Sequence, residues 1–185
     1  VAQFVRLEQD VRVGTREDAD NPGQIAARAY LGVAWVGPNI DGLPYDRSFF
    51  GGGVNGLRGW ATRDVGPGGV VDPENAGVIR GLGEWRAELN VEYREPLTET
   101  FILAMFLDAG NVWMREAEAV AAEATWSGQR WRSVAWNGGI GARWDFGFFL
   151  LRLDGGLRLH DPTQPLGTRW IGQTKARGAF HIGIG

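Results

Sequence analysis

The chain lacks several features that would place it in a common functional class. It has no cysteine, which excludes a disulfide scaffold and thiolate chemistry, and only 2 histidines among its 185 residues. No run approaches the roughly 20 apolar residues that a membrane-spanning helix needs. Basic residues are not in excess, because the net charge is −3. We therefore expect no nucleic-acid partner.

Glycine and tryptophan are abundant instead, with 29 and 9 residues respectively. Frequent glycine with dispersed aromatic residues disfavours a helical bundle and favours many strands joined by turns. The length suits a single domain. The composition therefore predicts an all-β fold.

Residues 84–94 form the clearest predicted strand. Every even position in this range is polar, and the odd positions are tryptophan, alanine, leucine, valine and tyrosine. Alternation with a period of two is typical of a strand, because successive side chains point to opposite faces. The same test identifies residues 134–145 and 149–159. Further strands are predicted at residues 3–13, 24–36, 101–113 and 179–184, which makes about seven strands.

The predicted connections alternate in length. Those at residues 94–100 and 146–148 are short, whereas those at 37–83, 114–130 and 160–178 are long. Short turns at one end and long loops at the other are typical of transmembrane barrels of the bacterial outer membrane. Residues 115–125, rich in alanine and glutamate, predict a short helix inside one long loop. Aromatic residues near the strand ends suit the water–lipid interfaces: Trp35, Trp85, Tyr93, Phe101, Trp113, Trp131 and Trp144.

A water-soluble sandwich or a lipocalin-like barrel would show the same alternation. In that case the apolar residues, such as Trp85, Leu89 and Val91, would lie inside, and the charged residues would face water. Alternation alone leaves both arrangements open. The strand number favours the membrane arrangement, because about seven strands leave unpaired edges unless further strands complete a barrel.

The glycine-rich segment from Ser48 to Trp60 contains one arginine, Arg58. Glycines allow the backbone of such a segment to pass close to a barrel wall, so Arg58 can enter the lumen. A guanidinium there needs carboxylate partners. Glu92 lies on the polar face of its strand, and Asp108 interrupts the next, apolar strand. The short turn between these strands makes them antiparallel neighbours. The sequence therefore predicts an Arg58–Glu92–Asp108 cluster, with three separate solvated charges as the alternative.

Residues 49–60 resemble the inward loop motif of the outer-membrane barrel superfamily that includes BamA, TamA and the two-partner secretion transporters. This superfamily is also described as the bacterial surface antigen domain. Residues 88–96 and 106–113 are similar to the family strands that follow the loop. Residues 138–144 and 151–154 are similar to its penultimate strands. The order and spacing of these matches hold across nearly the whole chain.

The resemblance implies an antiparallel transmembrane barrel of about sixteen strands, of which residues 1–185 would be the carboxy-terminal part. It implies that Glu92 and Asp108 accept hydrogen bonds from Arg58. It also implies a closing strand at the barrel seam, with Phe180, Ile182 and Ile184. The residues of the inward motif would be Gly52, Gly53, Leu57, Arg58, Gly59 and Trp60. In Trp60 the chain departs from the phenylalanine or tyrosine of the family.

The implied function is insertion or export of other proteins at the bacterial outer membrane. The implied partners are outer-membrane lipid, client outer-membrane or surface proteins, and the amino-terminal strands and periplasmic repeats of the same protein. The chain supplies only about seven strands, opens without a signal peptide and does not end on the aromatic residue of the family. We therefore expect it to be truncated at both ends. A half-barrel completed by another chain is the alternative.

Enzymatic activity is not expected. His160 and His181 have no serine or acidic residue at a suitable spacing for nucleophilic catalysis. Gly51, Gly52 and Gly53 lack the following lysine and serine of a phosphate-binding loop. We expect neither a cofactor nor a metal. The remaining alternatives to an insertase or translocase are a passive porin-like channel and a soluble ligand-binding β-barrel.

Overall fold

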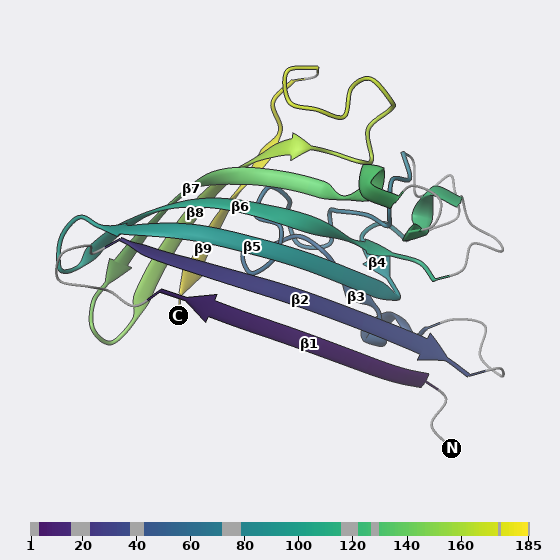
Figure 1. Cartoon of the computed structure of the whole chain (residues 1–185), viewed down its shortest axis with the longest axis horizontal. Coiled ribbons are helices and arrows are strands. Elements are labelled where there is room, and N and C mark those ends of the chain that lie inside the picture. Colours follow the sequence, from purple (N-terminus) through teal and green to yellow (C-terminus); the bar gives the residue numbers. More distant parts are fainter. Residues whose placement is uncertain are drawn as a thin grey trace.

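Seven antiparallel strands form one curved sheet in the computed structural model, in the order β1-β2-β5-β6-β7-β8-β9 (Figure 1). The structure describes residues 4–15, 23–37, 43–71, 79–115, 122–126, 130–173 and 175–184. The strands are β1 (Phe4–Gly14), β2 (Gln24–Val36), β5 (Trp85–Pro96), β6 (Phe101–Trp113), β7 (Ala135–Asp145), β8 (Leu150–His160) and β9 (Gly178–Ile184). The predicted all-β fold and its seven strands are confirmed.

Short elements occupy the long connections. Strands β3 (Phe49–Phe50) and β4 (Leu82–Gly83) pair with each other beside the main sheet. The 3-10 helices are η1 (Tyr45–Arg47), η2 (Ala122–Ala124) and η3 (Arg130–Ser133). The helix expected at residues 115–125 is described only at its carboxy-terminal end, where η2 is a single turn, and residues 116–121 lie outside the described part. No helix in the described ranges is long and apolar enough to cross a membrane.

The sheet is open at both sides among the described residues. The pairing ends at β1 on one side and at β9 on the other, and these two strands do not pair with each other. Each edge therefore presents a row of unpaired backbone N–H and C=O groups, which in a membrane must find a partner. The arrangement is that of part of a barrel, as the strand count predicts.

Antiparallel register brings polar residues of neighbouring strands together on one face. Asp108 of β6 lies opposite Asn90 of β5 and Asn137 of β7. Residues directly opposite each other share a face, so the polar positions line up across the sheet. Residues 48–71 and 79–84, called here the inward loop, fold against this polar face (Figure 1). We call it the inner face.

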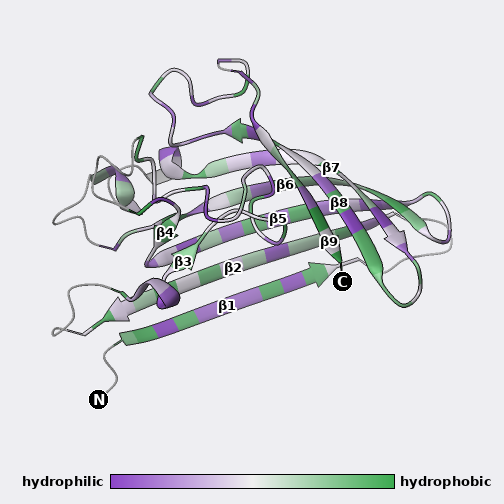
Figure 2. Ribbon diagram, turned by 180° about the vertical axis from the view of Figure 1, so that it is seen from behind, coloured by the Kyte–Doolittle hydropathy of each residue, from purple (hydrophilic) through white to green (hydrophobic). Residues whose placement is uncertain are grey.

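The opposite, outer face is apolar and exposed. Leu89 on β5 is 49% exposed and Ile140 on β7 is 63% exposed, and each strand alternates between the two faces (Figure 2). Exposed apolar residues on five further strands continue this surface: Val11, Leu31, Met105, Leu107, Leu157 and Ile182. A contiguous apolar surface of this kind is what a lipid bilayer covers. The soluble-barrel alternative, with Leu89 and Val91 inside, is wrong for this fold.

The tightest apolar packing lies between the inward loop and the inner face. Phe49, Leu57, Trp60 and Val65 of the loop are fully buried. Phe49 packs with Tyr30 and Ala34 of β2 and with Val112 of β6. Leu57, Trp60 and Val65 pack with Ala135 at the start of β7. The loop thus supplies the hydrophobic core that the open sheet itself lacks.

We predict that adjacent residues of β1 report opposite environments. Val11→Cys on the outer face, labelled with an environment-sensitive fluorophore in a cysteine-free background of the full-length protein, should be quenched by brominated phospholipids. Arg12→Cys, next in the same strand but on the inner face, should be quenched by aqueous iodide instead. Equal quenching of both labels by lipid would contradict this assignment of the two faces.

Candidate functional site

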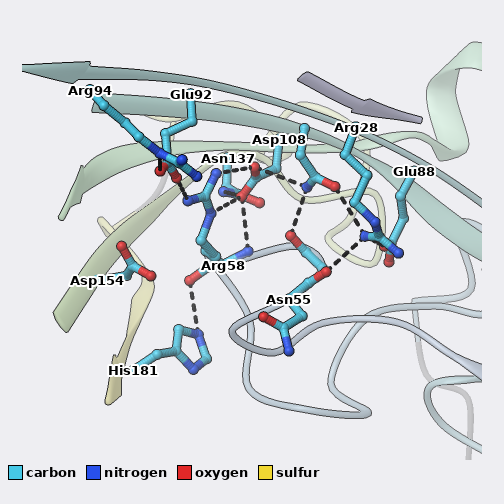
Figure 3. Close-up of polar contacts among 12 residues, drawn as sticks. Arg28, Asn55, Arg58, Glu88, Glu92, Arg94, Asp108, Asn137, Asp154 and His181 are labelled. Atoms are coloured by element: carbon cyan, nitrogen blue, oxygen red, sulfur yellow. Dashed lines mark hydrogen bonds and ion pairs between the residues drawn. The ribbon is translucent and has the colours of Figure 1, made fainter. Parts of the chain in front are cut away.

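Arg58 lies at the tip of the inward loop, against the inner face of the sheet (Figure 3). Its Nε donates to Oδ2 of Asp108 over 2.9 Å, and its Nη2 donates to Oδ1 over 2.7 Å. Its Nη1 donates to Glu92. The guanidinium carbon also lies 3.6 Å from the centroid of the Phe106 ring. One planar cation therefore makes a two-point contact with one carboxylate, a contact with a second and a stacking contact with an aromatic ring.

The Arg58 side chain is almost completely buried, with 3% of the residue exposed. Burial by itself would lower the pKa of its guanidinium. The hydrogen bonds and negative charge of Asp108, followed by those of Glu92, outweigh burial and raise that pKa. The cation therefore stays charged, and two neighbouring carboxylates compensate it.

Asp108 connects the loop with three strands. Besides the guanidinium, it accepts hydrogen bonds from the Arg58 backbone N–H over 3.2 Å, from Asn90 over 3.0 Å and from Asn137 over 2.8 Å. Its side chain is fully buried. Every hydrogen bond that replaces water around this carboxylate comes from a neutral amide or from Arg58, so the buried charge is well solvated by protein.

Glu92 continues the chain of ion pairs across the inner face, from β5 toward β8. Arg143 of β7 donates to Glu92 over 2.9 Å, and Arg94 donates to it over 2.7 Å. Arg143 in turn lies 3.0 Å from Asp154 of β8, which Arg152 also contacts. The charges thus alternate in sign from β5 to β8, and each buried carboxylate has at least one arginine beside it.

Four backbone carbonyls of the loop tip accept hydrogen bonds from side chains of the sheet. Arg28 of β2 donates to the carbonyl of Asn55 over 2.8 Å, and Asn90 donates to that of Gly56 over 2.9 Å. His181 of β9 donates from Nε2 to the carbonyl of Arg58 over 3.1 Å, and Arg158 of β8 donates to that of Gly59 over 3.1 Å. The loop tip is therefore held from β2 to β9.

Glycines allow this close approach. A Cβ on Gly156 of β8 would lie 2.5 Å from the Arg58 carbonyl oxygen, and a Cβ on Gly59 would lie 2.6 Å from Cβ of Asn137. Gly52 and Gly53 have φ values of 87° and 91°, which lie in the left-handed region that favours glycine. A Cβ on Gly52 would also meet the Ala61 carbonyl oxygen at 2.2 Å.

The structure brings together the three residues predicted to form the charge cluster, Arg58, Glu92 and Asp108. The other predicted motif residues lie in the same loop as Arg58: Gly52, Gly53, Leu57, Gly59 and Trp60. The predicted seam residues Phe180, Ile182 and Ile184 lie elsewhere. They are exposed on the outer face of β9 and do not contact the cluster. It is His181, between them on the inner face, that contacts the loop.

Sequence reasoning missed several residues of the site. They share inner-face positions at the level of Asp108 or near it: Arg28, Asn90, Asn137, Arg143, Asp154 and His181. Asn90 could have been found, because a register for the two strands joined by residues 97–100 places it opposite Asp108. Among the described residues, no group of three or more histidine, aspartate or glutamate side chains is arranged to hold a metal ion.

Residues 3–185 match the model of the Omp85 superfamily domain. The chain belongs to the Omp85 superfamily. The resemblance seen in the sequence is thereby confirmed, since the match spans the loop motif and all seven strands of the sheet. Comparison with curated proteins gives no match.

Two solved structures of this superfamily share the fold. BamA from Haemophilus ducreyi, in a structure lacking POTRA domains 1–3, superposes with a TM-score of 0.70 at 16% identity over 98% of this chain. CdiB from Acinetobacter baumannii superposes with a TM-score of 0.53 at 18% identity over 85%. The chain covers 35% of the BamA chain and 24% of the CdiB chain. It is therefore similar to only part of each.

We predict that Gly156→Ala loosens the loop, because the added methyl group meets the Arg58 carbonyl. Overpacking of this kind costs about 1–3 kcal/mol. Gly155→Ala is the matched control, since a Cβ there meets nothing within 4 Å. Urea unfolding of the full-length protein in lipid vesicles should show a loss of stability for the first variant only. Equal midpoints for both variants would contradict the close approach of loop and strand.

Proposed function

We propose that residues 1–185 are the carboxy-terminal part of an Omp85 barrel that inserts or exports other proteins at the bacterial outer membrane. Membership of the superfamily and the fold shared with BamA and CdiB support this proposal. The apolar outer face supports a place in a lipid bilayer. The missing amino-terminal strands and periplasmic domains would complete the protein.

The observation that carries the proposal is the buried attachment of the inward loop through Arg58. A passive channel conducts through an open lumen, and nothing in that task requires a loop fixed to five strands by ion pairs and hydrogen bonds. Here one arginine holds the loop to β5 and β6, while loop carbonyls bind side chains of β2, β5, β8 and β9. A loop attached in this way suits a barrel whose strands must keep their arrangement while the pairing between its first and last strands opens.

The proposed action involves no bond chemistry. The edge of β9 that does not pair with β8 has no strand partner among the described residues. An exposed strand edge is a template for adding another strand. A client strand would pair with an edge of this kind while the apolar face of the client moves into lipid. The loop would keep β5 to β9 in register during that exchange.

We predict that Arg58→Ala in the full-length protein, reconstituted in liposomes, slows assembly of an unfolded outer-membrane barrel client. The substitution leaves Asp108 and Glu92 buried without their cation, and breaking a buried pair costs about 3–5 kcal/mol. Arg58→Lys keeps the charge but loses the two-point contact, so its effect should be intermediate. Assembly is measured as client that becomes protease-resistant and heat-modifiable on electrophoresis.

Arg47→Ala is the control, because Arg47 is an exposed arginine near the same loop. Heat-modifiable mobility of each variant reports whether its own barrel has folded, and Arg58→Lys carries the test if Arg58→Ala does not fold. Full client assembly by a folded Arg58→Lys and a folded Arg58→Ala would sink the proposal. Ion conductance without client assembly by the wild-type protein would favour a passive channel instead.

A further inference from the structure

A cavity of about 440 Å³ lies on the inner face beside the loop tip, away from the apolar outer face. Five arginines from five segments line it: Arg12 of β1, Arg28 of β2, Arg58 of the loop, Arg94 of β5 and Arg152 of β8. Glu92 is its one acidic lining residue among the described residues. Figure 3 shows Arg28, Arg58 and Arg94 around the loop tip, with Asn55 among them.

Two of these arginines are more exposed than the carboxylates that pair with them. The side chains of Arg94 and Arg152 are 41% and 24% exposed, while those of their partners Glu92 and Asp154 are 8% and 0% exposed. Arg12 is 73% exposed and pairs with Asp10, whose side chain is 31% exposed. Arg94 and Arg152 reach their carboxylates through Nε. No described residue accepts a hydrogen bond from the Nη groups of these two arginines. The accessible charge of the cavity is therefore positive, and donors remain free for a ligand.

We propose that this cavity binds an acidic polypeptide segment. Free Nη donors on Arg94 and Arg152 match carboxylates, since guanidinium groups bind carboxylates through paired hydrogen bonds. The cavity is also lined by Ala26 and Val54, which suit the apolar part of a peptide and gain nothing from an inorganic anion. A lipid headgroup is disfavoured, because the lipid-facing surface is on the other side of the sheet.

The spread of the arginines across the sheet points to an extended ligand. In the order β1-β2-β5-β6-β7-β8-β9, Arg12 and Arg152 lie on strands separated by four others, and Arg94 lies between them. One compact anion cannot contact all of these strands, whereas successive carboxylates of a chain can. Each of the three residues lies two positions from the end of its strand, at the end of the sheet where the turns are short. In outer-membrane barrels this end faces the periplasm, from which client chains arrive.

The inference rests on the proposed function, because it identifies acidic segments of client chains as what the barrel recognises. The binding test uses full-length protein in detergent with fluorescein-labelled hexaglutamate and, as a neutral probe, hexaglutamine. Fluorescence anisotropy should show binding of hexaglutamate only, weakening as salt increases. The double variant Arg94→Gln/Arg152→Gln should bind hexaglutamate at least about tenfold more weakly, because it removes two charged donors.

Arg47→Gln is the matched control and should bind as the wild type does, since Arg47 lies outside the cavity. Heat-modifiable mobility confirms that each variant has folded. Equal hexaglutamate affinity in the folded double variant, or binding of inorganic pyrophosphate with no binding of hexaglutamate, would overturn the proposal. Client assembly that depends on Arg58 while hexaglutamate does not bind would reject the acidic-peptide site and leave the proposed function standing. Hexaglutamate binding that depends on Arg94 and Arg152, without client assembly by the wild-type protein, would support the acidic-peptide site and reject the proposed function.

Discussion

The contact between Arg58 and Asp108 is the interaction on which the rest of the inner face depends. Asp108 is fully buried on β6, and its acceptor positions are used by Arg58, Asn90 and Asn137. Without the arginine, a buried carboxylate would keep only neutral donors. A buried ion pair adds little stability relative to a well-packed apolar pair, but it is costly to break and strict about geometry. It therefore specifies one position of the loop more than it adds total stability.

That specificity matters because the fold is inverted relative to a soluble barrel. Apolar side chains face outward, so the sheet has no hydrophobic interior of its own. The inward loop supplies one, through Phe49, Leu57 and Trp60. Because these residues are carried by a loop and not by a strand, their packing depends on holding the loop in place. The ion pairs and the four bound carbonyls provide that hold.

Much of this fold could be predicted from the sequence. Alternation predicts three of the seven strands, at residues 84–94, 134–145 and 149–159, since a helix would scatter polar residues spaced two apart around its whole circumference. Parity and one short turn placed Glu92 and Asp108 on the same face of neighbouring strands. The remaining site residues escaped because their roles depend on where the loop tip lies. Arg28 on β2 and His181 on β9 contact loop carbonyls from strands far apart in the sheet. No local pattern in either strand reveals a contact with a segment more than twenty residues away.

The charges of the inner face differ between the level of Asp108 and the end of the sheet near the short turns. At the level of Asp108, carboxylates and arginines are matched and buried, so their fields largely cancel and their effect is to position the loop. Toward the short turns, Arg94 and Arg152 are more exposed than the carboxylates that pair with them, and they retain accessible Nη donors. The same pairs that fix the wall thus leave a positive surface on its open side. Each of these ion pairs is neutral overall, so the pairs add no net charge to the protein. Because the arginines of Arg94–Glu92 and Arg152–Asp154 are more exposed than the carboxylates, the surface can still attract acidic chains.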